Sequence, residues 1–191
     1  MANKNAPFGF RPARHLTGGT IREAKYNIAS ALAANIGVGS IVVETGTSGA
    51  NGRPYITLAA ADGAQTGVFM GVKYRDPNTG DVVYARRWVS GQTTFNSEDA
   101  EAIVIDDPAV VYEIQMSGAL AAANIGLLAD LVIGAPNAQT GRATTAVDSA
   151  DLAGSAVKIL GLAPIAGNEL GTYGIVEVLL GNAVPHERTA V

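Results

Sequence analysis

The sequence predicts an all-β protein built of two tandem, duplicated small β-barrel or sandwich lobes that follow an extended N-terminal arm. Short β-branched runs recur about every 8–14 residues and are separated by turns, a spacing typical of small barrels and sandwiches. The composition is rich in small residues, with 23 glycines in 191 residues and 6% aromatics, which does not suit a helical bundle. A set of residues in the first half also returns in the second, which favours an internal repeat.

The repeat depends on positions that recur at an offset of 86 to 90. Residues 31–37 (ALAANIG) resemble residues 119–126 (ALAAANIG), and in each copy a Gly-Arg pair follows the Asn after 17 positions. Further pairs are Gly71 with Gly161, Tyr84 with Tyr173, and Tyr26 with Tyr112. We therefore expect an arm over 1–19, a first lobe over 20–105, a second over 106–184 and a tail over 185–191. Coincidence in an Ala/Gly-rich chain is the alternative.

Residues 1–19 predict an extended arm that docks. Two prolines, three glycines and the absence of periodicity argue against a regular element. Phe8 and Phe10 are nevertheless half of the four phenylalanines, and solvated tails rarely carry aromatic residues. Burying them with Leu16 would not offset the ordering of the chain, so backbone hydrogen bonds, for example to a sheet edge, are also expected. A disordered leader is the alternative.

The β-branched and apolar runs then place the strands in order. Strands are expected over residues 20–29, 39–45, 55–59, 67–74, 82–89, 100–107, 110–115, 127–133, 143–147, 157–163 and 173–180. Residues 30–37 and 150–156 read as loops or short helical turns, and Gly-containing polar segments at 46–53, 62–63 and 136–141 read as turns. Residues 76–81 predict a hairpin turn. Calcium binding there is disfavoured because Gly80 occupies a ligand position and no distal glutamate follows.

Charge is distributed unevenly along the chain. The formal net charge is −4 and the pI is near 5.1, which argues against nucleic acid as a partner. Residues 1–25 hold five basic side chains against Glu23 alone, whereas the rest holds eight basic and 16 acidic ones. A basic arm that includes Arg11 and Arg14 could therefore seek an acidic surface on a neighbour, including a second copy of the chain.

Nothing in the sequence predicts an enzyme. There is no cysteine, and the two histidines, His15 and His186, lie in the arm and the tail, so neither a triad nor a metal centre is expected. Asp106 and Asp107 are adjacent and would point apart on a strand. Glu98, Asp99 and Glu101 read as an acidic surface patch. No phosphate-binding or dinucleotide motif, signal peptide or membrane-length apolar run is visible. No cofactor, membrane or nucleic-acid partner is expected.

One segment outside the arm combines positive charge with an aromatic ring. Arg86, Arg87 and Trp88 could stack on or pair with an acidic partner. An ordinary half-buried strand is the alternative, because alternation puts only one arginine on each face.

Several segments resemble a family of virion proteins of tailed bacteriophages, the capsid decoration, cement or head-stabilisation proteins. They are residues 7–22 (PFGFRPARHLTGGTIR), 67–74 (GVFMGVKY), Asp107-Pro108, 112–115 (YEIQ), 159–162 (ILGL) and 168–171. The resemblance spans most of the chain but not its last stretch, and its motifs carry no chemistry. It implies a β-rich protein seated on the outside of an icosahedral shell, often as a trimer, that locks capsid subunits together.

The combined expectation is a non-enzymatic structural protein, made in the host cytoplasm and carried on the outer surface of the virion. Its partner would be the major capsid protein of the same phage, and it would be a homotrimer or a dimer. The arm residues Phe8, Phe10, Arg11, Arg14 and Leu16 are the candidate contacts. A different head or tail subunit remains open, as does a β-type surface module that binds glycans, which would need exposed aromatics.

Overall fold

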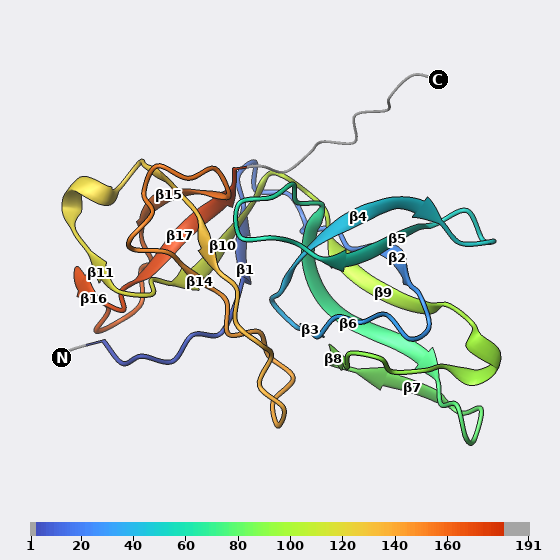
Figure 1. Cartoon of the computed structure of the whole chain (residues 1–191). Helices are drawn as coiled ribbons and strands as arrows, with labels where there is room; N and C mark the ends of the chain where they lie inside the picture. The colour runs from blue at the N-terminus through green and yellow to red at the C-terminus, as the bar shows by residue number, and fades with distance from the viewer. Residues whose placement is uncertain (1–2, 182–191) are drawn as a thin grey trace.

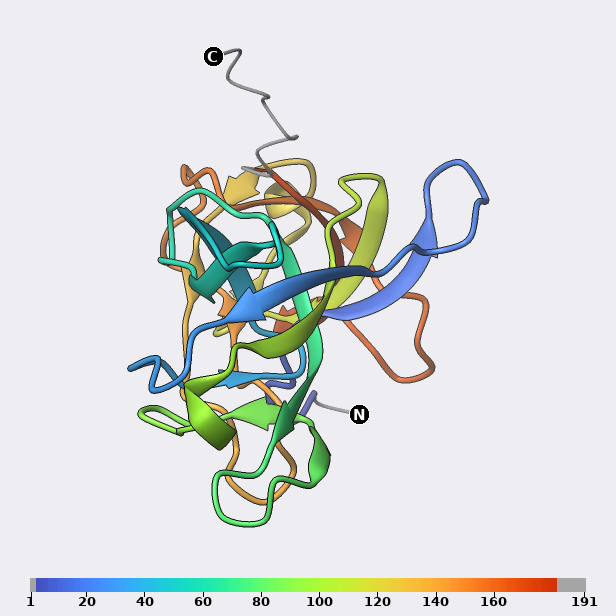
Figure 2. The same ribbon diagram turned by 90° about the vertical axis from the view of Figure 1, so that its right-hand side faces the viewer.

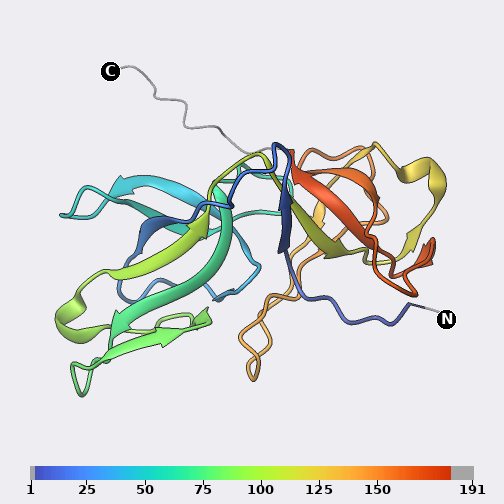
Figure 3. The same ribbon diagram turned by 180° about the vertical axis from the view of Figure 1, so that it is seen from behind.

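The structure is a computed structural model that describes residues 3–181 (Figure 1). The all-β class is confirmed. The helical segments among these residues are two 3-10 turns, η1 (Phe95–Ser97) and η2 (Ala122–Asn124). Two strand-built lobes lie side by side, and the first strand of the chain runs along their junction (Figures 1 and 3). The expected tail at 185–191 and His186 lie outside the described residues. No helix in the described part is long and apolar enough to cross a bilayer.

The first lobe is a closed five-stranded barrel. Its strands are β2 (Ala24–Ile28), β4 (Ile41–Ser48), β5 (Pro54–Leu58), β6 (Gly67–Arg75) and β9 (Ala100–Ile105). They pair in the order β4–β5–β2–β9–β6, and β6 returns to β4 through Gly67 and Val68. Beyond that contact β6 also pairs with β7 (Val82–Ala85), while β3 (Ile36–Gly37) pairs with β8 (Arg87–Trp88). The expected strand at 82–89 is therefore broken at Arg86 into two strands with different partners.

Trp88 anchors the core of the first lobe. Its side chain has no exposed area, meets Tyr74 edge to face at 6.1 Å, and donates from Nε1 to the carbonyl of Leu32 at 3.3 Å. Burying a ring of this size contributes about 3 kcal/mol or more of hydrophobic stabilisation. The expectation that Trp88 forms part of an interface is therefore wrong for this chain, because the pairing of β8 with β3 turns the indole inward.

The second lobe is built on a second antiparallel sheet, whose strands are mostly shorter. β10 (Val110–Gln115), β17 (Ile175–Leu180), β15 (Val157–Leu162) and β12 (Leu128–Ala129) pair in that order. β13 (Leu131–Val132) follows β12 after Asp130 and pairs with β14 (Ala146–Val147). A parallel bridge between Met116 and Val147 leads back to the end of β10. β11 (Ala119–Leu120) and β16 (Gly171–Thr172) form a separate pair.

The two lobes share one strand-pairing scheme. β2, β9, β6 and β4 pair in the same order and sense as β10, β17, β15 and β12. A β-bulge interrupts both schemes at the same place, between Phe69 and Gly71 and between Ile159 and Gly161. The correspondence of Gly71 with Gly161 thus agrees with the strand register. Descent of the lobes from a duplicated segment stays a prediction.

Two other sequence correspondences do not follow the strands. Tyr84 lies on β7, whereas Tyr173 directly precedes β17, the counterpart of β9. The first lobe carries the extra strands β7 and β8 between β6 and β9, which shifts the last strand out of the constant offset. Tyr26 pairs with Ala102, and the matching position of the second lobe is Ile114, opposite Val176, not Tyr112.

The arm contains a strand. β1 (Arg11–His15) pairs antiparallel with β10 at the edge of the second lobe's sheet, with a register shift between Pro12 and Arg14. The expectation that the arm lacks a regular element is therefore wrong, because a strand at the edge of a sheet tolerates a proline, which has no amide N–H to donate to a neighbouring strand. Docking on a sheet edge is confirmed, and the edge belongs to the same chain.

Backbone hydrogen bonds join the lobes at a seam where three segments meet. The Phe10 amide donates to Gly39 at 2.9 Å, Val38 donates to Gly141 at 3.0 Å, and Ala143 donates to Val38 at 2.9 Å. One hydrophobic cluster also runs across the junction, from Ile41, Ala59, Val68 and Ile105 of the first lobe into the core of the second. The two lobes therefore form one packed body.

Candidate interaction surface

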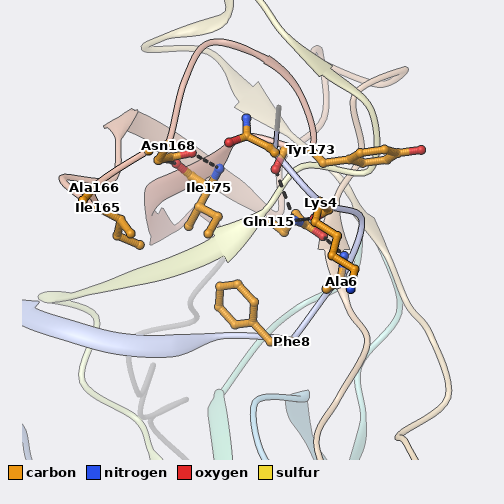
Figure 4. Close-up of a pocket in the computed structure, with 11 residues that line it drawn as sticks. Lys4, Ala6, Phe8, Gln115, Ile165, Ala166, Asn168, Tyr173 and Ile175 are labelled. Atoms are coloured by element: carbon orange, nitrogen blue, oxygen red, sulfur yellow. Dashed lines mark hydrogen bonds between the residues drawn. The ribbon is translucent and has the colours of Figure 1, made fainter. Parts of the chain in front are cut away.

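The arm closes over a hollow of about 380 Å³ on the second lobe (Figure 4). Gln115, only 3% exposed, holds the arm there: its amide donates to the carbonyls of Lys4 and Tyr173 and accepts from the Ala6 amide at 2.9 Å. The side-chain amide of Asn168 donates to the carbonyl of Ile175 and accepts from the amide of Ile175. The side-chain amides of Gln115 and Asn168 stabilise the fold, since their partners are backbone groups of the same chain. The remaining lining is chiefly apolar and includes Phe8.

A second hollow of about 200 Å³ lies at the seam and shares Phe8 with the first. Its lining combines apolar and cationic side chains from the arm and both lobes, namely Phe8, Phe10, Arg11, Pro12, Val38, Met70, Arg86 and Arg142. The site exists only because the arm and the two lobes meet here. No single stretch of the sequence contains it.

A third hollow of about 220 Å³ continues from the seam along the first lobe. It shares Met70 and Arg86 with the seam hollow and extends over Gly71 and Ile103 to Tyr84 on β7. Tyr84 is 73% exposed, which is unusual for a large aromatic ring, and it carries the ammonium of Lys73 at 5.9 Å from its ring centre. Each hollow shares lining residues with the next, and we call the three together the seam groove.

The arginines of the described residues fall into two groups. Five of those in the described residues have a carboxylate partner, in the pairs Arg11–Glu113, Arg14–Glu177, Arg22–Asp106, Arg53–Glu101 and Arg75–Glu98. Arg86, Arg87 and Arg142 have no such partner within the described chain. Arg86 and Arg142 are exposed and line the seam hollow. Two of the three arginines without a carboxylate partner among the described residues therefore line the groove.

The arm residues expected to contact a partner have different surroundings. Phe10 is 2% exposed and packs in the chain's own core, so its assignment to an interface is wrong for this chain. Arg11 and Arg14 pair with Glu113 and Glu177 of the second lobe. Leu16 is 49% exposed at the end of the arm. Phe8 is half-buried in the groove, with the Arg11 guanidinium 5.0 Å from its ring centre.

The adjacent carboxylates Asp106 and Asp107 take separate partners. Asp106 accepts from the Tyr26 hydroxyl at 3.1 Å, and burial is the main cause that raises the pKa of Tyr26, with Asp106 adding to it. Asp107 accepts from the Ala109 amide and from His15 Nε2 at 3.1 Å, and these contacts lower its pKa. Both residues follow the end of β9 and do not lie on it, contrary to the expected strand over 100–107. Asp106 holds the barrel through Tyr26, and Asp107 holds the arm through His15.

Metal-binding groups do not gather in the described residues, where no cluster of three or more His, Asp or Glu side chains could hold an ion. The turn at 76–81 is a hairpin turn: Asp76 Oδ1 accepts from the amides of Asn78 and Thr79 at 2.8 and 3.1 Å. Its carboxylate thus stabilises the turn directly.

Sequence reasoning found Phe8 and Arg86 but missed Met70, Tyr84 and Arg142. Met70 and Arg142 come from different lobes, and no local pattern predicts their meeting. Tyr84 could have been suspected, because alternation on its short strand places it with Val82 on one face. Val82 is also exposed, at 53%.

No family model, curated protein or solved structure matches the chain.

Proposed function

We propose that the chain is a structural protein of a tailed-phage virion that sits on the outer surface of the capsid and bridges its subunits. The proposal starts from the resemblance of the arm and of residues 112–115 to capsid decoration proteins. In the structure these two motifs are partners: β1 pairs with β10, Phe10 packs on Tyr112, and Arg11 pairs with Glu113. The residues that carry the resemblance thus form one structural unit, which supports reading them as a signature of a fold.

The observation that carries the adhesive role is the seam groove. It places an exposed aromatic ring, Tyr84, and two unpaired guanidinium groups, Arg86 and Arg142, on one packed two-lobed body. Interfaces are enriched in tyrosine and arginine, because these side chains bring large contact area and directional hydrogen bonds. A rigid body with such a face is suited to bridging neighbouring subunits.

The proposed partner is the major capsid protein, and the proposed assembly is a homotrimer, with a dimer as the second choice. A protein that binds only the assembled shell shifts the equilibrium against disassembly. An oligomer that grips several subunits gains from effective concentration, so weak contacts in each chain suffice.

Other adhesive roles fit the structure less well. A glycan-binding module would need several exposed aromatic platforms. Trp88, the single tryptophan, is fully buried, and among the described residues Tyr84 alone is an exposed large aromatic ring. A different head or tail subunit would have a similar composition, and its position in the particle would distinguish it from a decoration protein.

The test adds purified protein to heads that lack it and measures both binding and the temperature at which the heads release DNA. Saturable binding to assembled heads but not to free capsid subunits, with a higher release temperature, is expected. Binding confined to tails, or none to heads, would contradict the proposal.

A further inference from the structure

We propose that the seam groove binds an extended acidic peptide segment of a partner protein, with carboxylates on Arg86 and Arg142 and apolar side chains over Phe8 and Met70. This inference rests on the proposed adhesive function and specifies the chemistry of the segment that is gripped. Four observations support it: the fixed placement of two arginines, the absence of a carboxylate partner for them within the described residues, the apolar lining, and the continuation of the groove to Tyr84.

The backbone fixes the two arginines next to each other. The amide of Val38 is shared between the carbonyls of Arg86 at 2.9 Å and Gly141 at 3.0 Å, and Val38 bridges Arg142 in parallel. A Cβ placed on Gly141 would lie 2.8 Å from the Cβ of Arg86. Residues from the two lobes are thus held in contact by the seam, so their side chains start from fixed positions. Such preorganisation lowers the entropic cost of gripping a ligand.

The positive charges of Arg86 and Arg142 are not neutralised within the described chain. The protein carries an excess of acidic side chains, and five of the six other arginines described have a carboxylate partner, the exception being Arg87. Both side chains line the same hollow, so one acidic segment bound there could pair with both. Guanidinium groups also bind carboxylates in a planar, two-bond geometry.

The apolar lining selects the class of ligand. Phe8, Pro12, Val38 and Met70 line the hollow together with the exposed Arg86 and Arg142. A bound segment that covers this apolar surface would exclude water from the ion pairs formed there and so strengthen them. A free inorganic anion would pair with the two arginines but leave this apolar surface exposed to water. A peptide that alternates carboxylates with apolar side chains would use both.

The extent of the groove favours an extended segment. The seam hollow continues past Met70 and Arg86 to Tyr84, whose exposed ring offers a further apolar contact. Nucleic acid is the less favoured ligand, because two free arginines in a protein of net charge −4 do not form a continuous cationic track.

The test screens an array of short peptides in which glutamates alternate with leucine or phenylalanine, alongside matched peptides with glutamine in place of glutamate. The full-length chain is expected to bind acidic members and not their neutral counterparts. For the best acidic member, measured by fluorescence anisotropy, the double variant Arg86→Gln/Arg142→Gln should weaken binding by about tenfold or more. Binding should also weaken as salt rises from about 50 to about 300 mM.

The control is the double variant Arg22→Gln/Lys158→Gln, which removes the same charge at exposed positions outside the groove lining. It should bind as the wild type does. Circular dichroism and the urea midpoint verify that both variants fold.

The inference is overturned if no acidic peptide binds, if neutral peptides bind equally, or if the groove variant keeps its affinity. Tighter binding of a single-stranded DNA oligomer would replace the peptide with nucleic acid. Self-association lost in the groove variant would replace the partner with a second copy. Wild-type binding to heads, kept by the groove variant, would refute this inference and leave the proposed function standing.

Discussion

Phe10 and Tyr112 meet edge to face, with ring centroids 5.7 Å apart and ring planes at 89°. Both rings are buried, at 2% and 0% exposure, so the arm's aromatic side chain is a core residue of the second lobe. The contact explains why an arm with two prolines is ordered. The ring of Phe10 is buried directly before β1, and β1 itself pairs with β10.

Replacing Phe10 with alanine should destabilise the protein by about 3–5 kcal/mol, because the change removes a buried ring and leaves a cavity beside Tyr112. Urea unfolding measures the loss. Leu16→Ala is the control in the same arm, since Leu16 is 49% exposed, and it should change stability by less than about 0.5 kcal/mol. Equal losses in the two variants would show that the arm does not pack as described.

Tyr112→Phe should leave stability unchanged or raise it by about 1 kcal/mol. The Tyr112 hydroxyl is buried and has no hydrogen-bond partner among the described residues, so removing it removes an uncompensated desolvation cost. The same burial raises the pKa of Tyr112. A loss of more than about 1 kcal/mol in urea unfolding would reveal a partner for the hydroxyl.

The sequence was sufficient to predict the strand-rich class and most strong strands, because β-branched runs such as residues 67–74 and 175–180 fill buried positions. It was insufficient for β1. The side chains of an edge strand face solvent and ion-pair partners, so Arg11 and Arg14 mask the pattern. It also failed for Trp88, whose burial depends on a two-residue pairing with β3.

The candidate site was the least predictable part. Arg86 and Arg142 are distant in sequence and become neighbours only because the seam joins Val38 to both. No periodicity encodes such a contact. The shared bulge at Gly71 and Gly161 was visible as a recurring glycine, but the extra strands β7 and β8 obscured the correspondence beyond it.

Gly9 and Gly18 give a matched pair of substitutions, because both have a φ of +73°. A Cβ on Gly9 would lie 2.7 Å from the Ala143 Cβ and 2.7 Å from the Gly39 oxygen, whereas a Cβ on Gly18 would have nothing within 4 Å. Gly9→Ala should therefore cost about 1–3 kcal/mol more than Gly18→Ala in urea unfolding. Equal costs would mean that the arm is not inserted between the lobes at this position.

Stability should fall at acid pH partly through Asp107. The Ala109 amide and His15 lower its pKa in the folded state, although partial burial opposes them. A group with a depressed folded pKa contributes stability above its unfolded pKa of about 3.9, and this contribution is lost as pH falls through the folded value. Asp107→Asn should therefore reduce the unfolding free energy at pH 6 and flatten its decline below about pH 4. An acid limb as steep as that of the wild type would contradict the role of Asp107.

Electron cryomicroscopy of intact virions would show whether this protein decorates the capsid. The account predicts density for the two-lobed body on the outer face of the capsid, with the seam groove occupied by a segment of a neighbouring protein. Capsids without such density, or the protein found only in the tail or inside the head, would contradict it.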